Sequence, residues 1–160
     1  MGIHDREYVR REVRRPGLPP VTKWLLILNI GIFLLDFLQR PDPPRPGAYG
    51  WGPINREFCF AFASAVQGGR VWEFVTFQFL HDSIGHILFN SIGIYFFGPF
   101  VERWWGSRRF IAYYLLCGAA GGLFFSLLLL IGLLPNATVY TPLVGASAGW
   151  FGLLFAVYRL

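Results

Sequence analysis

Long runs of apolar residues alternate with shorter polar segments along this chain. The apolar stretches cover residues 24–38, 84–101, 110–134 and 144–160. A helix needs about 20 largely apolar residues to cross a membrane, with a range of roughly 17–25. The third stretch, FIAYYLLCGAAGGLFFSLLLLIGLL, meets this length and lacks the polar face that a helix of a soluble bundle would show. The pattern predicts an all-α, polytopic membrane bundle with four transmembrane helices.

The long loop between the first two stretches divides into two parts. Residues 39–53 are rich in proline and glycine, which predicts an extended and exposed segment. Residues 57–80 are too aromatic for a plain aqueous loop. Amphipathic rings collect at the boundary between water and lipid, and the rings expected there are Trp72, Phe74, Phe77 and Phe79. We therefore expect an aromatic loop that lies half-submerged against the bundle.

Composition and charge agree with a membrane protein. Hydrophobic residues make up 54% of the 160 residues and charged residues 14%, against about 45–50% and about 25% in soluble domains. Lys and Arg gather in residues 1–23 and in the link 101–109, which predicts that both segments are cytoplasmic. We expect residues 1–23 to form a basic cytoplasmic tail and residues 24–160 a membrane domain. The expected location is the bacterial inner membrane.

Two polar side chains interrupt the second stretch. His86 and Asn90 are four residues apart in the segment HILFN, so a helix brings them to one face. Polar groups within a membrane are costly unless they are paired or wetted. Taken alone, this pair fits a hydrogen bond between neighbouring helices as well as it fits a functional site.

The fourth stretch begins TPLVGASAGWFG and holds a serine among small residues. A helix that starts near Gly145 would place Ser147 in its first turn, where backbone N–H groups lack helical partners. These donors and the positive end of the helix dipole suit an oxyanion. Small residues four apart, such as Gly145 and Gly149, are also common packing devices in membranes. Together with His86 and Asn90, however, Ser147 predicts an acyl-transfer site.

These motifs resemble those of the rhomboid family of intramembrane serine proteases. The likeness rests on HxxxN in the second stretch, VERWWGS in the link and GASAG at the start of the fourth stretch, in that order. The resemblance implies that Ser147 is the nucleophile, and that His86 and Asn90 help its backbone N–H to stabilise the oxyanion. It also implies supporting roles for a further set of residues. In this set Glu102 and Arg103 match a structural pair, Phe151 matches an aromatic residue that packs against the catalytic histidine, and Gly145 opens the GASAG motif.

The chain departs from the family pattern in several places, one of them a mild change to Ala148 where the residue after the nucleophile is often glycine. Rhomboids often carry Trp-Arg late in the loop, where this chain has Trp72-Glu73, so the role of the arginine is absent or met elsewhere. The general base of the family is a histidine on the sixth transmembrane helix. The histidines here are His4, His81 and His86, and none of them matches that position. We therefore interpret the chain as the first four of six helices of a longer rhomboid, incomplete at its C-terminus and inactive alone.

Two functions follow from this resemblance. The first is a serine protease that cleaves transmembrane protein substrates within the lipid bilayer by acyl transfer at Ser147. The second is a rhomboid-like pseudoprotease that binds membrane helices without cleaving them. Retention of Ser147, His86 and Asn90 favours the protease, because a binding protein would not need oxyanion donors. We expect no metal, no organic cofactor and no nucleic-acid partner, since the chemistry needs only water, a serine and a base.

The arginine clusters yield a testable topology. We predict that the N-terminus and the link 102–109 face the cytoplasm, because Lys and Arg mark cytoplasmic segments. A thiol reagent that cannot cross membranes, added outside sealed cells, should label a cysteine at position 48 and miss one at position 107. Labelling at position 107 in intact cells would reverse the orientation.

Overall fold

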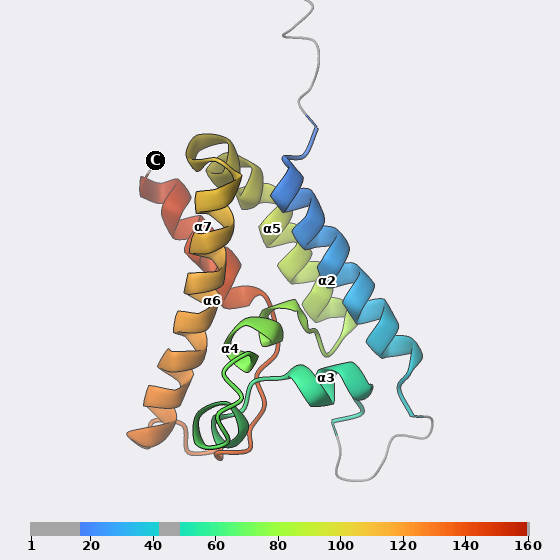
Figure 1. Ribbon diagram of the computed structural model, residues 1–160, viewed down its shortest axis with the longest axis vertical. Coiled ribbons are helices and arrows are strands. Elements are labelled where there is room, and N and C mark those ends of the chain that lie inside the picture. Colours follow the sequence, from blue (N-terminus) through green and yellow to red (C-terminus); the bar gives the residue numbers. More distant parts are fainter. Residues whose placement is uncertain (1–16, 42–48, 160) are drawn as a thin grey trace, which may run out of the picture.

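Four helices of 13 to 24 residues make up the bundle shown in Figure 1. They are α2 (Pro20–Leu38), α5 (Ile84–Trp105), α6 (Ser107–Leu130) and α7 (Ser147–Arg159). The computed structural model describes residues 17–41 and 49–159, and within these ranges it contains no strand. The predicted all-α membrane bundle is therefore confirmed. Residues 1–16 of the predicted basic tail and residues 42–48 of the proline-rich segment lie outside the described residues, so the division into tail and membrane domain stays a prediction.

Three of the four predicted spans form helices long and apolar enough to cross a membrane, namely α2, α5 and α6. The fourth predicted stretch, residues 144–160, contains α7, which starts three residues later and has 13 residues. At 1.5 Å per residue the described part of α7 is about 20 Å long. The helix begins only at Ser147 because Gly145 has a φ of +122°, which a right-handed helix cannot include.

The predicted polar link between the second and third stretches is largely helical. Helix α5 continues to Trp105 and α6 starts at Ser107, so only Gly106 separates them. Gly106 has a φ of +77°, a conformation that glycine adopts without strain and that ends the first helix. The sequence pattern places the end of an apolar stretch at the first charged residue, but a helix can continue through charged residues. Helix α5 therefore ends later, and α6 begins earlier, than the apolar stretches.

Glu102 joins the ends of three helices. Its buried carboxylate accepts hydrogen bonds from the backbone N–H groups of Val21 and Thr22 at 2.9 and 2.7 Å. The hydroxyls of Thr22 and Ser107 also donate to it, each at 2.7 Å. Because the first N–H groups of a helix have no helical partner, this carboxylate of α5 caps α2. The neighbouring Arg103 donates to the carbonyl oxygen of Gly17 at 3.3 Å.

The loop between α2 and α5 folds into short helical segments, the first of which packs against α2 and a later one against α6 (Figure 1). They are α3 (Pro53–Phe58), a π-helical turn (Ala63–Gln67), α4 (Glu73–Thr76) and a 3-10 turn (Phe77–Phe79). The ring of the fully buried Phe60 lies 4.8 Å from that of Phe74 and 5.8 Å from that of Phe77. Phe77 is buried and Phe74 partly buried in a core around Phe60, whereas Trp72 is 49% exposed. The position of these rings at the lipid boundary stays a prediction.

Asp36 ties this loop to α2. Its buried carboxylate accepts hydrogen bonds from the backbone N–H groups of Gly52 at 3.1 Å and Asn55 at 2.8 Å. The side-chain amide of Asn55 in turn donates to the carbonyl oxygen of His81 at 2.8 Å. The end of α2 and the segment that leads into α5 are thereby held to the same short helix, α3.

Residues 131–146 lead from the end of α6 back into the bundle without forming a helix (Figure 1). Residues of the aromatic loop between α2 and α5 supply hydrogen-bond partners for the backbone N–H and C=O groups of this segment. The hydrogen bonds join Phe60 and Leu143 in both directions at 3.1 and 2.7 Å, Ala63 N–H to Val139 O at 2.8 Å, and Gly145 N–H to Phe77 O at 2.9 Å. Non-helical backbone is tolerated at membrane depth where protein surrounds it, so the aromatic loop allows α7 to begin inside the bundle.

Small residues let α7 approach its neighbours closely. A Cβ atom built onto Gly121 of α6 would lie 2.6 Å from the Cβ of Ala148, and one built onto Gly149 would lie 2.7 Å from the ring of Tyr114. On the other side of α7, a Cβ atom on Gly93 of α5 would lie 2.6 Å from the indole of Trp150. The packing interpretation of Gly149 is therefore correct, and these contacts set the position of α7.

We predict that Glu102→Gln lowers the free energy of unfolding by about 1–3 kcal/mol, the range expected when buried donors lose a charged acceptor. The measurement is an unfolding titration in detergent micelles. The matched control is Glu57→Gln, because Glu57 forms an exposed ion pair with Arg70, and such pairs contribute at most about 1 kcal/mol. Equal stability of the Glu102 variant and the wild type would contradict the capping role.

Candidate functional site

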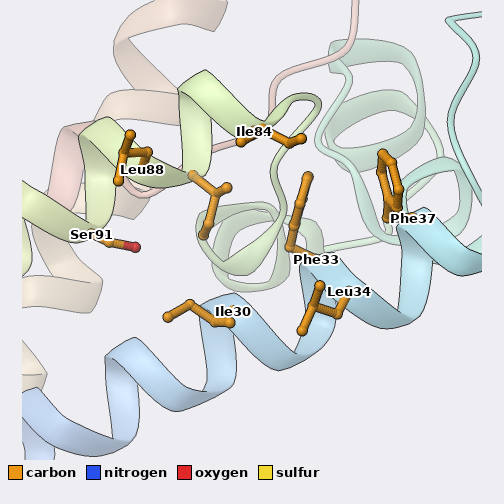
Figure 2. Close-up of a pocket in the computed structure, with 8 residues that line it drawn as sticks. Ile30, Phe33, Leu34, Phe37, Ile84, Leu88 and Ser91 are labelled. Atoms are coloured by element: carbon orange, nitrogen blue, oxygen red, sulfur yellow. The ribbon is translucent and has the colours of Figure 1, made fainter.

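An apolar groove lies away from the polar residues that the sequence singles out. It has a volume of about 400 Å³ and runs between α2 and α5, as Figure 2 shows. Its walls are apolar side chains such as Phe33 and Leu88, with Ser91 as a polar exception. The lining residues include no titratable group, so the groove offers no acid, base or nucleophile.

The site begins where α5 meets the turn before α7. A Cβ atom built onto Gly145 would lie 2.5 Å from Nε2 of His86 and 3.4 Å from Nδ2 of Asn90. Both the close approach and the φ of +122° therefore require glycine at this position. The structure brings Gly145, His86 and Asn90 together, and Ser147 follows two residues later as the first residue of α7.

Asn90 is held in one orientation by a residue that sequence reasoning missed. The indole N–H of Trp150 donates to Oδ1 of Asn90 at 2.8 Å. Asn90 is 1% exposed, and its Nδ2 has no hydrogen-bond partner among the described residues. Leaving a buried donor unpaired costs about 1–3 kcal/mol. This amide is therefore a donor available to a ligand at the turn before Ser147.

The sequence carried one signal for Trp150. It lies three residues after Ser147, so a helix places both residues on neighbouring parts of one face. Its indole is a hydrogen-bond donor and usually finds a partner when buried. That partner could not be named from the sequence, because it depends on how α5 and α7 are rotated against each other.

His86 is half-buried and is held on two sides. Its Nδ1 lies 2.9 Å from Oδ1 of Asp82, and its ring contacts that of His81 edge to face with centroids 5.1 Å apart. Partial burial by itself would raise the pKa of Asp82, but hydrogen bonds from His86 and Ser83 outweigh it and lower that pKa. Asp82 is therefore a carboxylate at neutral pH.

Ser147 is half-buried at the start of α7. The backbone N–H groups of this first turn lack helical partners, and the positive end of the helix dipole lies here. These donors, with Nε2 of His86 and Nδ2 of Asn90 close to Gly145, form an arrangement that can stabilise negative charge on a carbonyl oxygen. Phe151, one turn further on, is exposed and stacks on Trp150 with ring centroids 4.1 Å apart.

The arginine that the loop pattern lacks has a counterpart nearby. Arg70 forms an ion pair with the buried Glu73 at 2.9 Å, and its guanidinium lies 5.4 Å from the ring centre of Trp72. An arginine therefore lies beside the Trp72-Glu73 pair, supplied from two residues upstream. Within the described ranges, no three His, Cys, Asp or Glu side chains form a group that could hold a metal ion.

Comparison with known proteins points to one family. Residues 68–160 match the family model of the rhomboid domain. The chain is 31% identical to YdcA of Bacillus subtilis over 141 residues, which cover 88% of this chain and 62% of YdcA. It is 32% identical to the rhomboid protease GluP of the same organism over 147 residues, covering 88% of this chain and 24% of GluP.

A eukaryotic relative shows the same likeness. The chain is 35% identical to the rhomboid-related protein 1 of Caenorhabditis elegans over 145 residues, which cover 86% of this chain and 37% of that protein. The chain thus spans less than two thirds of the length of each of these three relatives.

His81 makes the stability of the fold dependent on pH. Its burial and the neighbouring His86 lower its pKa from 6.5 to about 3. The native state therefore binds fewer protons, so stability is complete above pH 6.5 and is lost as the pH falls towards 3. We predict that the free energy of unfolding is about 2 kcal/mol lower at pH 5 than at pH 7.5.

The measurement is an unfolding titration in detergent micelles at both pH values. The control is His81→Phe, which keeps a buried aromatic ring and removes the titrating group. The pH dependence should largely disappear in this variant, and an unchanged pH dependence would show that another group causes it.

Proposed function

The chain belongs to the rhomboid family, and we propose that it is part of an intramembrane serine protease whose nucleophile is Ser147. One observation carries the proposal: the unpaired Nδ2 of Asn90 and the Nε2 of His86 both approach the glycine turn that precedes Ser147. Two polar groups of α5 thus lie at the turn two residues before Ser147 and the free N–H groups of α7, an arrangement that suits acyl transfer.

In the proposed reaction, Oγ of Ser147 attacks a peptide carbonyl carbon while a general base takes the hydroxyl proton. The carbonyl oxygen becomes an oxyanion, which accepts hydrogen bonds from the backbone N–H of Ser147 and from the side chains of His86 and Asn90. The base then protonates the leaving amine, and the C–N bond breaks to leave an acyl-serine. Water hydrolyses this ester and restores the serine.

We place the general base outside residues 1–160. His86 lies beside the developing oxyanion, where a proton donor is needed, so it is poorly suited to accept the proton of Ser147. His81 is fully buried against His86, and His4 lies outside the described residues. The relatives YdcA and GluP extend beyond the region that this chain matches, which gives room for a further histidine.

The proposed substrates are transmembrane proteins, cut near their outer ends within the bilayer. The three membrane-length helices and the family support a multi-pass protein of this kind. We place the N-terminus in the cytoplasm and the protein in the bacterial inner membrane. The support for this orientation is the arginines of residues 1–23 and of the link between α5 and α6.

We predict that, in the full-length protein, Asn90→Ala and His86→Ala each slow cleavage of a transmembrane substrate by roughly 10- to 1000-fold, the effect of losing an oxyanion donor. Ser147→Ala should abolish both cleavage and labelling by a fluorophosphonate probe. The measurement is the initial rate of cleavage in proteoliposomes.

Ser91→Ala is the matched control, because Ser91 is the next residue of α5 and faces the groove toward α2. It should cleave at the wild-type rate. Wild-type rates in the Asn90 and His86 variants would show that these two residues serve only the packing of the helices. A folded full-length protein that binds substrates and never labels at Ser147 would support the pseudoprotease instead.

A further inference from the structure

We infer that Asp82 is a positioning residue that keeps a proton on Nδ1 of His86, so that Nε2 donates to the oxyanion only when the ring is doubly protonated. This inference rests on the proposed function of Ser147. It assigns a role to Asp82, which lies outside the HxxxN motif and before the start of α5.

The geometry fixes where the first proton of the ring lies. Asp82 is four residues before His86 in the sequence, and its Oδ1 is 2.9 Å from Nδ1 of the ring. An ionised carboxylate can only accept hydrogen bonds, so Nδ1 must be the donor. The opposite nitrogen, Nε2, is the atom closest to the Cβ position of Gly145. Asp82 therefore determines that Nε2 of His86 is turned towards the proposed active site and that the first proton of the ring lies on Nδ1.

This proton position has a chemical consequence. A neutral imidazole carries one N–H, so with Nδ1 protonated its Nε2 holds a lone pair and cannot donate. Donation to an oxyanion then requires the imidazolium, which a neighbouring carboxylate stabilises. A charged donor also forms a stronger hydrogen bond than a neutral one. When the ring carries both protons, the Asp82–His86 pair is thereby a charge-assisted donor.

The other groups around the ring do not oppose this charge. His81, which contacts the ring from the same segment, has a pKa of about 3 because it is buried, and so it stays neutral. Across the turn the ring meets the backbone of Gly145, and Asn90 beside it is an uncharged amide. Among the described residues, Asp82 is the carboxylate that the structure pairs with His86.

Substitution of Asp82 should leave the fold intact, because its side chain is 47% exposed and precedes the helix. Three variants of the full-length protein separate the possible roles. Asp82→Asn keeps an oxygen that can accept from Nδ1 and removes the charge. Asp82→Ala removes both, and Asp82→Glu restores the charge. Glu57→Gln, which removes an exposed carboxylate elsewhere in the loop, is the matched control.

The first readout is the 15N spectrum of histidine-labelled protein, with His86 assigned by its loss in His86→Asn. We expect the Nδ1–H tautomer for neutral His86 in the wild type and in Asp82→Asn, and a shift to the Nε2–H tautomer in Asp82→Ala. An Nε2–H tautomer in the wild type, or identical spectra in wild type and Asp82→Ala, would overturn the inference.

The second readout is the rate of cleavage. In Asp82→Asn, kcat should fall roughly 3- to 10-fold with little change in KM. Asp82→Glu should recover the wild-type kcat, and the Glu57 control should match the wild type. An unchanged kcat in Asp82→Asn would contradict the inference.

The two readouts also separate this inference from the proposed function. A protein that shows the Nδ1–H tautomer and its loss in Asp82→Ala, and yet never cleaves or labels at Ser147, would refute the proposed function while supporting the proton position. A protein that cleaves through Ser147 without the expected tautomer would do the reverse.

Discussion

Unpaired backbone groups cannot be left in an apolar bundle, and this constraint governs how α7 is placed. Residues 131–146 reach the start of α7 without forming a helix, so their N–H and C=O groups need other partners. The aromatic loop supplies them through Phe60, Ala63 and Phe77. The rings of Phe60 and Phe77 also form part of a buried core. One segment therefore provides both the hydrogen bonds and the core. Without that loop, the turn at Gly145 would have no backbone partner to hold it beside His86.

Buried carboxylates solve the same problem at the helix ends. Glu102 accepts from the first N–H groups of α2, and Asp36 accepts from those of the short helix α3. A carboxylate has room for several donors, whereas a neutral side chain has fewer. Each of these acids therefore joins its own helix to at least one other element. Together they hold α2 against α5 and against the segment that carries His81.

Local geometry explains what the sequence could predict. The spacing of His86 and Asn90 and the helix start near Ser147 follow from helical periodicity and from glycine. The end of α5 and the start of α6 were misplaced, because charged residues such as Arg103 continue a helix as readily as apolar ones. The partner of Trp150, the core position of Phe77 and the pairing of Asp82 depend on how separate elements are rotated against one another. No local pattern contains that information.

The depth of each charged or dipolar group also decides how dissolved salt affects it. Gly145 and Ala146 are buried where α7 begins, so the positive end of that helix is partly shielded from mobile ions. Asp82 and His86 form a partly exposed pair at the edge of the bundle. Exposed charges are screened by salt over a Debye length of about 8 Å at physiological ionic strength, whereas buried ones are screened much less. Ionic strength therefore weakens the electrostatics of the rim and leaves those of the interior nearly unchanged.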